Sequence, residues 1–289
     1  MDSAKIWRNI VTLLVKKKFA AILDLKWIFV TLLFFAGCQQ RASTNLTLEE
    51  RQQLEPLFNY VFFQNPGVFV LFGSKPMSEC SLPPLDSMSK EEAQKAFESM
   101  PESLRAQACL VECHLNEQWE VWKTVSKRLP LSSKYLLIEK NHGQGRILFF
   151  VHVVKCQEVI AAHYPYFKEL LGNDFSVPTA VLEIQNERSE FWNKALTDHK
   201  AMGLLFGFGE ENIALFDCPS SECCFASKSD PFSQASAKEF PIPTFLTTPN
   251  HPMIHQYESE REQIRKLYNE QDMLEISLNG LCDSAVLDR

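Results

Sequence analysis

Two glycine-containing segments carry the side chains best suited to chemistry. The first is Leu71-Phe-Gly-Ser-Lys-Pro76, and the second runs from His199 through Gly207-Phe-Gly-Glu-Glu-Asn212. A strand that leaves the core at Gly73 would present a hydroxyl and an ammonium group, and the later glycines would let the backbone approach a ligand closely. We predict that the two segments converge on one ligand site, with these candidate residues: Gly73, Ser74, Lys75, His199, Gly207, Gly209, Glu210, Glu211 and Asn212.

A structural interpretation of the same glycines is the alternative. Gly73 would then end a strand, and Gly207 and Gly209 would end a helix. Neither segment is a phosphate loop, because Gly-x4-Gly-Lys-Ser/Thr is absent and the later segment lacks the third glycine of a dinucleotide fingerprint. Ser87-Met-Ser-Lys90 matches the Ser-x-x-Lys of penicillin-recognising enzymes, but the Lys-Thr-Gly triplet that they also need does not occur. The sequence therefore predicts no catalytic residue, no metal site and no cofactor.

The cysteines form a second group of reactive side chains. Cys109 and Cys113 lie one turn apart on a predicted helix, and Glu117 extends the same line, but Cys-x3-Cys is not a common zinc spacing. Cys218, Cys223 and Cys224 cluster in a predicted loop. We expect disulfides among these five cysteines to attach the loop to the core, with free thiols or a shared soft metal as the alternatives. Their connectivity cannot be deduced from the sequence.

Residues 27–38, Trp-Ile-Phe-Val-Thr-Leu-Leu-Phe-Phe-Ala-Gly-Cys, follow a lysine-rich stretch. A basic flank, a short apolar core and small residues are typical of a secretory signal peptide. Here the chain resembles a bacterial lipoprotein precursor, whose lipobox reads roughly Leu-Ala-Gly-Cys. The resemblance implies cleavage before Cys38, lipidation of that cysteine and residence in the cell envelope, and Gln39 would favour the outer membrane. The alternatives are an uncleaved signal anchor and a soluble chain.

Removal of residues 1–37 makes the chain strongly acidic. The remaining residues include 23 basic and 34 acidic side chains, a net charge of −11. Such a surface repels phosphate backbones, so we expect no nucleic-acid partner.

Hydrophobic periodicity predicts an α+β protein with an antiparallel sheet, packed helices and a charged C-terminal helix. We expect a signal peptide at 1–37, a tether at 38–46, an α+β domain at 47–216, a Pro/Ser-rich irregular segment at 217–252 and the C-terminal helix at 253–289. The predicted elements are helices at 48–58, 102–129, 156–171, 188–206 and 253–278, a buried strand at 68–72, a loop at 73–84 and a hairpin at 135–154.

The sequence leaves three kinds of function open. The first prediction is an envelope lipoprotein that holds a protein partner, because the C-terminal helix repeats apolar residues that suit a groove-seeking face. The second is a small-ligand-binding protein or enzyme that uses the two glycine segments. The third is a thiol-redox or metal protein that uses the cysteines.

Overall fold

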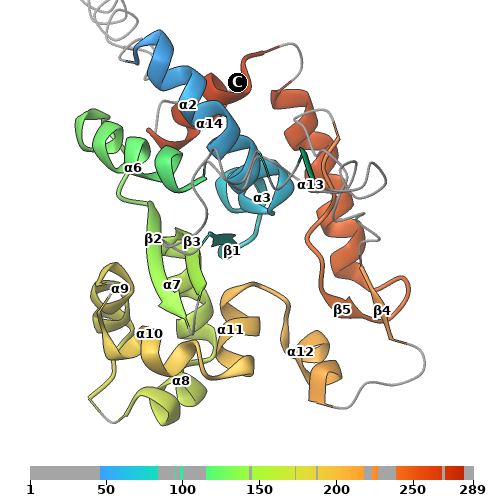
Figure 1. Ribbon diagram of the computed structural model, residues 1–289. Coiled ribbons are helices and arrows are strands. Elements are labelled where there is room, and N and C mark those ends of the chain that lie inside the picture. Colours follow the sequence, from blue (N-terminus) through green and yellow to red (C-terminus); the bar gives the residue numbers. More distant parts are fainter. Residues whose placement is uncertain are drawn as a thin grey trace, which may run out of the picture.

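The computed structural model describes residues 46–83, 95, 98–99, 115–142, 145–172, 174–186, 188–217, 223–226, 239–268 and 271–282. These residues form the predicted α+β fold: helices pack on both faces of an antiparallel three-stranded sheet (Figure 1). Within these ranges, no helix combines the length and the apolar character needed to span a bilayer. The signal segment, Cys38 and the predicted tether up to residue 45 lie outside the described residues.

The sheet consists of β1 (Met77–Leu82), β2 (Tyr135–His142) and β3 (Gly145–His152), in the order β1-β3-β2. The predicted hairpin is β2–β3, and β1 pairs antiparallel with the other edge of β3. Because successive strand residues face opposite sides, Leu148 and Phe150 enter one core while Phe149 and Val151 enter another.

The first core contains the two ends of the described chain. It is covered by α2 (Leu48–Asn59), the π-helical turn η2 (Tyr60–Gln64), α3 (Gly67–Leu71), α6 (Leu115–Val125), α13 (Pro252–Leu267) and α14 (Met273–Leu281). Thr47 begins α2 with a capping box to Glu50, as its sequence predicts. Aromatic rings meet edge to face throughout this core, for example Phe62 against Phe150 and Phe69 against Tyr257.

The second core lies on the opposite face of the sheet, under a run of short helices (Figure 1). These are α7 (Val153–Ala162), α8 (Tyr164–Leu171), α9 (Val177–Gln185), α10 (Glu190–Ala195) and α11 (His199–Leu205). The Trp192 ring stacks on Phe149 of β3 with its centroid 5.0 Å away. Helix α12 (Glu210–Asp217) and the short pair β4 (Cys224–Phe225) and β5 (Leu246–Thr247) complete the fold.

Two predicted elements near the candidate site are wrong. The apolar run 68–72 is helical up to Leu71, in α3, and not a strand, because a short continuous apolar run has no periodicity that separates the two. The predicted loop 73–84 contains β1, in which Ser78, Cys80 and Leu82 alternate toward the first core. A strand of small polar residues can still pair when every second side chain is buried.

Several predicted helices are real but divided. The 156–171 and 188–206 helices are each two helices, and the 253–278 helix breaks before Asp272, which caps α14. The loop expected around Val177-Pro178 is instead the start of α9, because Pro fits the first helical turn. The 102–129 helix is described from Leu115 onward, where it is helical as predicted.

The apolar face of the C-terminal helix is not exposed. Six residues were expected to seek a partner's groove: Ile254 is half-buried against the first core, and the others are buried in it, namely Tyr257, Ile264, Tyr268, Leu274 and Leu278. The prediction of a partly exposed face is therefore wrong for these residues, because they pack against α2, η2 and α3.

Candidate functional site

A cavity of about 310 Å³ opens beside the start of β1. It is lined by η2, the beginning of α3 and the extended segment 240–244, whose Phe240 ring meets Phe63 and Phe69. The floor is formed by Lys75, Ser78 and Glu79, with the rings of Phe206 and Phe208 beside them. The two segments that the sequence singled out therefore meet at one cavity, through Lys75 from the first and Phe206 and Phe208 from the second.

The π-helical turn shapes one wall of the cavity. In η2, both the backbone N–H and the side-chain amide of Asn65 donate to the Tyr60 carbonyl, at 3.0 and 2.9 Å. This i→i+5 turn is wider than an α-helical turn and often occurs at functional sites. Gly67 then begins α3 so close to the Val61 carbonyl oxygen that a Cβ atom would lie 2.4 Å from it. Residues 62–66, which line the cavity, are thus held by backbone contacts.

Lys75 is the most unusual side chain of the site. It is 1 % exposed, and its Nζ donates a 2.6 Å hydrogen bond to the Phe206 carbonyl at the end of α11. The ring centroids of Phe208 and Phe206 lie 4.6 and 5.4 Å from Nζ. No carboxylate among the described residues lies within ion-pair distance of this nitrogen. The dipole of α11 favours the charged form of Lys75 at the C-terminus of that helix. Burial opposes this effect, because the ammonium group is almost wholly shielded from solvent.

Burial lowers the pKa of Lys75 from 10.5 to about 7, because an apolar environment disfavours the charged form. The negative charge of Glu79 opposes this effect, whereas Cys156 stays a neutral thiol because burial raises its own pKa to about 12. Near neutral pH, Lys75 therefore exists partly as the free amine, which has a lone pair to offer.

The two glycines of the second segment form the turn that carries Phe206 and Phe208. Gly207 and Gly209 have φ values of +74° and +76°, a conformation that side-chain-bearing residues rarely adopt. A Cβ atom on Gly207 would also lie 2.7 Å from Pro76 Cδ. The structural interpretation holds for Gly207, which follows the end of α11; Gly209 instead precedes α12, and Gly73 follows helix α3 where a strand end was expected. The same turn also brings the second segment against the first.

The remaining predicted site residues do not line the cavity. Ser74 Oγ accepts from the Gln256 side chain, the Ser74 N–H donates to Glu260, and the Gly73 carbonyl accepts from Lys155. His199 is exposed at the start of α11. Glu210 faces His163 and Lys200, and Glu211 faces His251. Asn212 is buried and donates to the Phe208 carbonyl, so it supports the glycine turn.

Sequence reasoning missed most of the cavity walls. Phe62, Phe63 and Phe240 have no catalytic or ligand-binding pattern, and Ser78 was assigned to a loop. The segment Phe240-Pro-Ile-Pro-Thr244 was included in an irregular region, although two prolines in five residues are a signal of an extended wall.

The cysteine predictions fall mostly outside the described residues, as Cys109, Cys113 and Cys218 do. Cys223 and Cys224 are half-buried at β4, where Cys224 carries a free thiol. Cys80 and Cys156 are buried free thiols, and Cys156 Sγ donates to the Pro76 carbonyl. The disulfide hypothesis stays a prediction.

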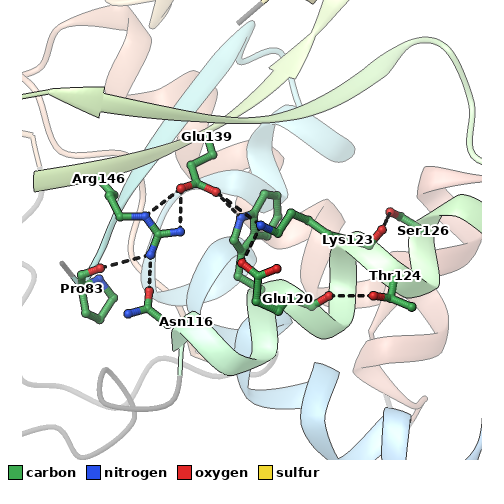
Figure 2. Close-up of polar contacts among 9 residues, drawn as sticks. Pro83, Asn116, Glu120, Lys123, Thr124, Ser126, Glu139 and Arg146 are labelled. Atoms are coloured by element: carbon green, nitrogen blue, oxygen red, sulfur yellow. Dashed lines mark hydrogen bonds and ion pairs between the residues drawn. The ribbon is translucent and has the colours of Figure 1, made fainter. Parts of the chain in front are cut away.

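A second buried cation lies at the other end of the β1–β3 ladder. Arg146, 5 % exposed, opposes Leu82 in the register and points toward α6. Its Nε and Nη2 donate to Glu139 Oε1 at 2.7 and 2.6 Å, and its Nη1 donates to Asn116 and to the Pro83 carbonyl (Figure 2). Glu139 Oε2 in turn accepts from Trp119 Nε1. This cluster joins α6 to the sheet.

Comparison of the chain with protein-family models, with curated proteins and with solved structures gives no match in any of the three.

Proposed function

We propose that this chain is a small-ligand-binding protein whose site is the cavity between η2, the extended segment 240–244 and the Gly207 turn. The observation that carries the proposal is the meeting of segments 71–76 and 199–212 at a cavity of about 310 Å³, with a buried lysine in its floor. This volume is at the lower end of the usual range for ligand sites, so the ligand would be a compact molecule.

The chemistry of the walls favours a ligand with a flat apolar body. Phenylalanines from four separate segments line the cavity; Phe206 and Phe208 are partly exposed, whereas Phe62, Phe69 and Phe240 are buried behind its surface. Such rings bind apolar and aromatic groups by burying apolar surface and by edge-to-face contacts. The polar groups gather on the floor at Lys75, Ser78 and Glu79, so they would orient one functional group of the ligand.

Benzyl alcohol is a suitable first probe, because it combines one ring with one hydroxyl group. We expect saturation-transfer NMR to detect its binding to the full chain. The variant Gln64→Trp, which enlarges a side chain of the cavity wall, should reduce the signal by at least about fivefold, as expected for a filled site. Gln52→Trp places the same indole on the exposed side of α2 and is the matched control. Equal binding by both variants would contradict the proposal.

We also propose that the chain is tethered to a membrane of the cell envelope through a lipid on Cys38. The support is the lipobox-type sequence of residues 27–38. Stable anchoring needs more than one acyl chain, which a lipidated N-terminal cysteine can carry. A protein partner in the envelope remains a prediction, although the helix face that motivated it is buried. The proposed partners do not include nucleic acid, because the net charge is −11 without residues 1–37.

The intact mass of the protein extracted from its native membranes tests the tether. Loss of residues 1–37 together with added acyl mass is the expected result, and Cys38→Ser should abolish both. A full-length mass without acyl groups would contradict the tether but leave the cavity proposal unaffected.

A further inference from the structure

We propose that Lys75 Nζ is a nucleophile that holds a small aldehyde or ketone in the cavity as an imine. This inference rests on the proposed ligand-binding function and names the chemical class of its ligand. The surroundings of Lys75 support it in three ways: the nitrogen is enclosed, no carboxylate of the described residues lies within ion-pair distance of it, and its side chain lines a cavity large enough for a small ring.

The enclosure of the amine determines how a reagent reaches it. Only 1 % of Lys75 is exposed, and the side chain lines the cavity. One N–H is directed to the Phe206 carbonyl at 2.6 Å, which fixes the position of the nitrogen. A carbonyl compound would therefore approach through the cavity, with its apolar body against the partly exposed Phe206 and Phe208.

The proposed step is balanced without a further reagent. The Nζ lone pair attacks the carbonyl carbon, and a proton moves from nitrogen to oxygen to give a carbinolamine. Loss of water then forms the C=N bond. The Ser78 hydroxyl also lines the cavity and would donate to the carbonyl oxygen, and the exposed Glu79 would exchange protons with water.

The protonation of Lys75 agrees with this role. Burial lowers its pKa to about 7, so a substantial share of the amine is neutral at physiological pH, whereas an exposed lysine is almost wholly protonated. The charged or titratable groups that act on Lys75 are Glu79 on β1 and Cys156 on α7; the Glu79 charge favours the protonated form, whereas burial keeps Cys156 a neutral thiol by raising its pKa to about 12. Desolvated lysines of this kind are the usual Schiff-base nucleophiles.

Lys155 provides an internal control. Burial also lowers its pKa, and its Nζ donates to the carbonyls of Val70 and Gly73 at the end of α3. Lys155 does not line the cavity. A lowered pKa without access to the cavity should therefore leave Lys155 unreactive toward a cavity ligand.

Benzaldehyde with sodium cyanoborohydride tests the inference on the full chain at neutral pH. The reductant converts an imine to a stable benzyl adduct, and peptide mapping locates it. We expect Lys75 to be modified at least about tenfold faster than Lys155 or the exposed lysines, in line with its larger share of neutral amine. Benzyl alcohol, which forms no imine, should slow the reaction at Lys75 alone. Gln64→Trp should slow it as well, and Gln52→Trp should not.

The outcomes separate the two proposals. Modification of Lys75 no faster than that of Lys155, while benzyl alcohol still binds and Gln64→Trp still blocks it, would overturn the imine and leave the ligand site intact. Absence of both binding and preferential modification would overturn both. If Gln64→Trp does not fold, competition by benzyl alcohol in the unmodified protein gives the same decision.

Discussion

Arg146 and Lys75 are buried cations at opposite ends of the β1–β3 ladder, and their surroundings differ. All three nitrogens of the Arg146 guanidinium group have hydrogen-bond acceptors, including the Glu139 carboxylate, and Glu139 is itself held by Trp119 (Figure 2). Lys75 has one carbonyl and two aromatic rings. The difference indicates two roles: the Arg146 cluster joins elements of the fold, whereas Lys75 is kept poorly satisfied beside a cavity.

The energetic argument follows from desolvation. A buried charge with a full set of partners recovers most of its lost hydration, so its removal leaves those partners unpaired. A buried amine without a counter-ion recovers little and tends to lose its proton instead. Poorly satisfied titratable groups beside cavities are frequent at functional sites, which is why the comparison points to Lys75 as the reactive residue.

The largest effect is expected for Arg146→Met. The substitution leaves Glu139, Asn116 and the Pro83 carbonyl without their shared donor, and Glu139 is a half-buried charge. We expect the free energy of unfolding to fall by about 3 kcal/mol, as in other broken buried ion pairs. Urea unfolding followed by tryptophan fluorescence measures this, because Trp119 is part of the cluster. A loss below about 1 kcal/mol would mean that the cluster does not hold α6 to the sheet.

A smaller effect on stability is expected for Lys75→Met at neutral pH. The substitution leaves the Phe206 carbonyl without its donor, a cost of about 1 kcal/mol, but it also removes a poorly solvated amine from an apolar wall. The two terms oppose each other, so the free energy of unfolding should change by no more than about 1 kcal/mol. A loss as large as that of Arg146→Met would contradict the comparison.

The pH dependence separates the two cations more sharply. The folded-state pKa of Lys75, about 7, lies below its ordinary value of 10.5. Below pH 7 the amine is protonated in both states, and the folded state bears the cost of burying the charge. As the pH rises above 7, the folded protein releases this proton before the unfolded chain does, so folding becomes more favourable.

Unfolding of the unmodified protein and of Lys75→Met should therefore be compared from pH 6 to about pH 9. The stability of the unmodified protein relative to Lys75→Met should increase over this range, by at most about 1.4 kcal/mol per pH unit. The same difference for Arg146→Met should stay nearly constant, because a guanidinium group does not titrate there. A flat difference for Lys75→Met would mean that its pKa is not lowered by burial.

Local signals in the sequence were enough for part of the fold. The capping box at Thr47 and the alternating hairpin strands identify α2, β2 and β3, because each depends on neighbours in the chain. Residues 68–72 and β1 could not be assigned in this way, because their structure depends on contacts with segments distant in the sequence. Val68 to Leu71 is wholly buried by other segments, so its apolar run carries no helical period, and β1 pairs with a strand that follows about 70 residues later.

The site was partly predictable, again where the signal is local in the sequence. Gly207, Gly209 and Lys75 can be singled out from the sequence. In the structure the two glycines have positive φ, and Lys75 contacts the turn that they form. The cavity walls are not visible, because Phe62 and Phe240 resemble any other core phenylalanine. Their role depends on the π-helical turn, which has no reliable sequence signal, and on where the proline-rich segment packs, which no local pattern predicts.

The smallest effect is expected for Lys123→Met, at the exposed end of the Arg146 cluster. The Lys123 side chain is 42 % exposed, lies 4.0 Å from Glu139 and pairs mainly with the exposed Glu120 (Figure 2). Exposed ion pairs contribute little, so the free energy of unfolding should change by no more than about 0.5 kcal/mol. The change should shrink further in high salt, while that of Arg146→Met should persist, because salt screens exposed charges more than buried ones. A large, salt-resistant loss of stability in Lys123→Met would show that both Lys123 and Arg146 stabilise the half-buried Glu139 carboxylate. The comparison with Lys75 would then have to include both cations of the cluster.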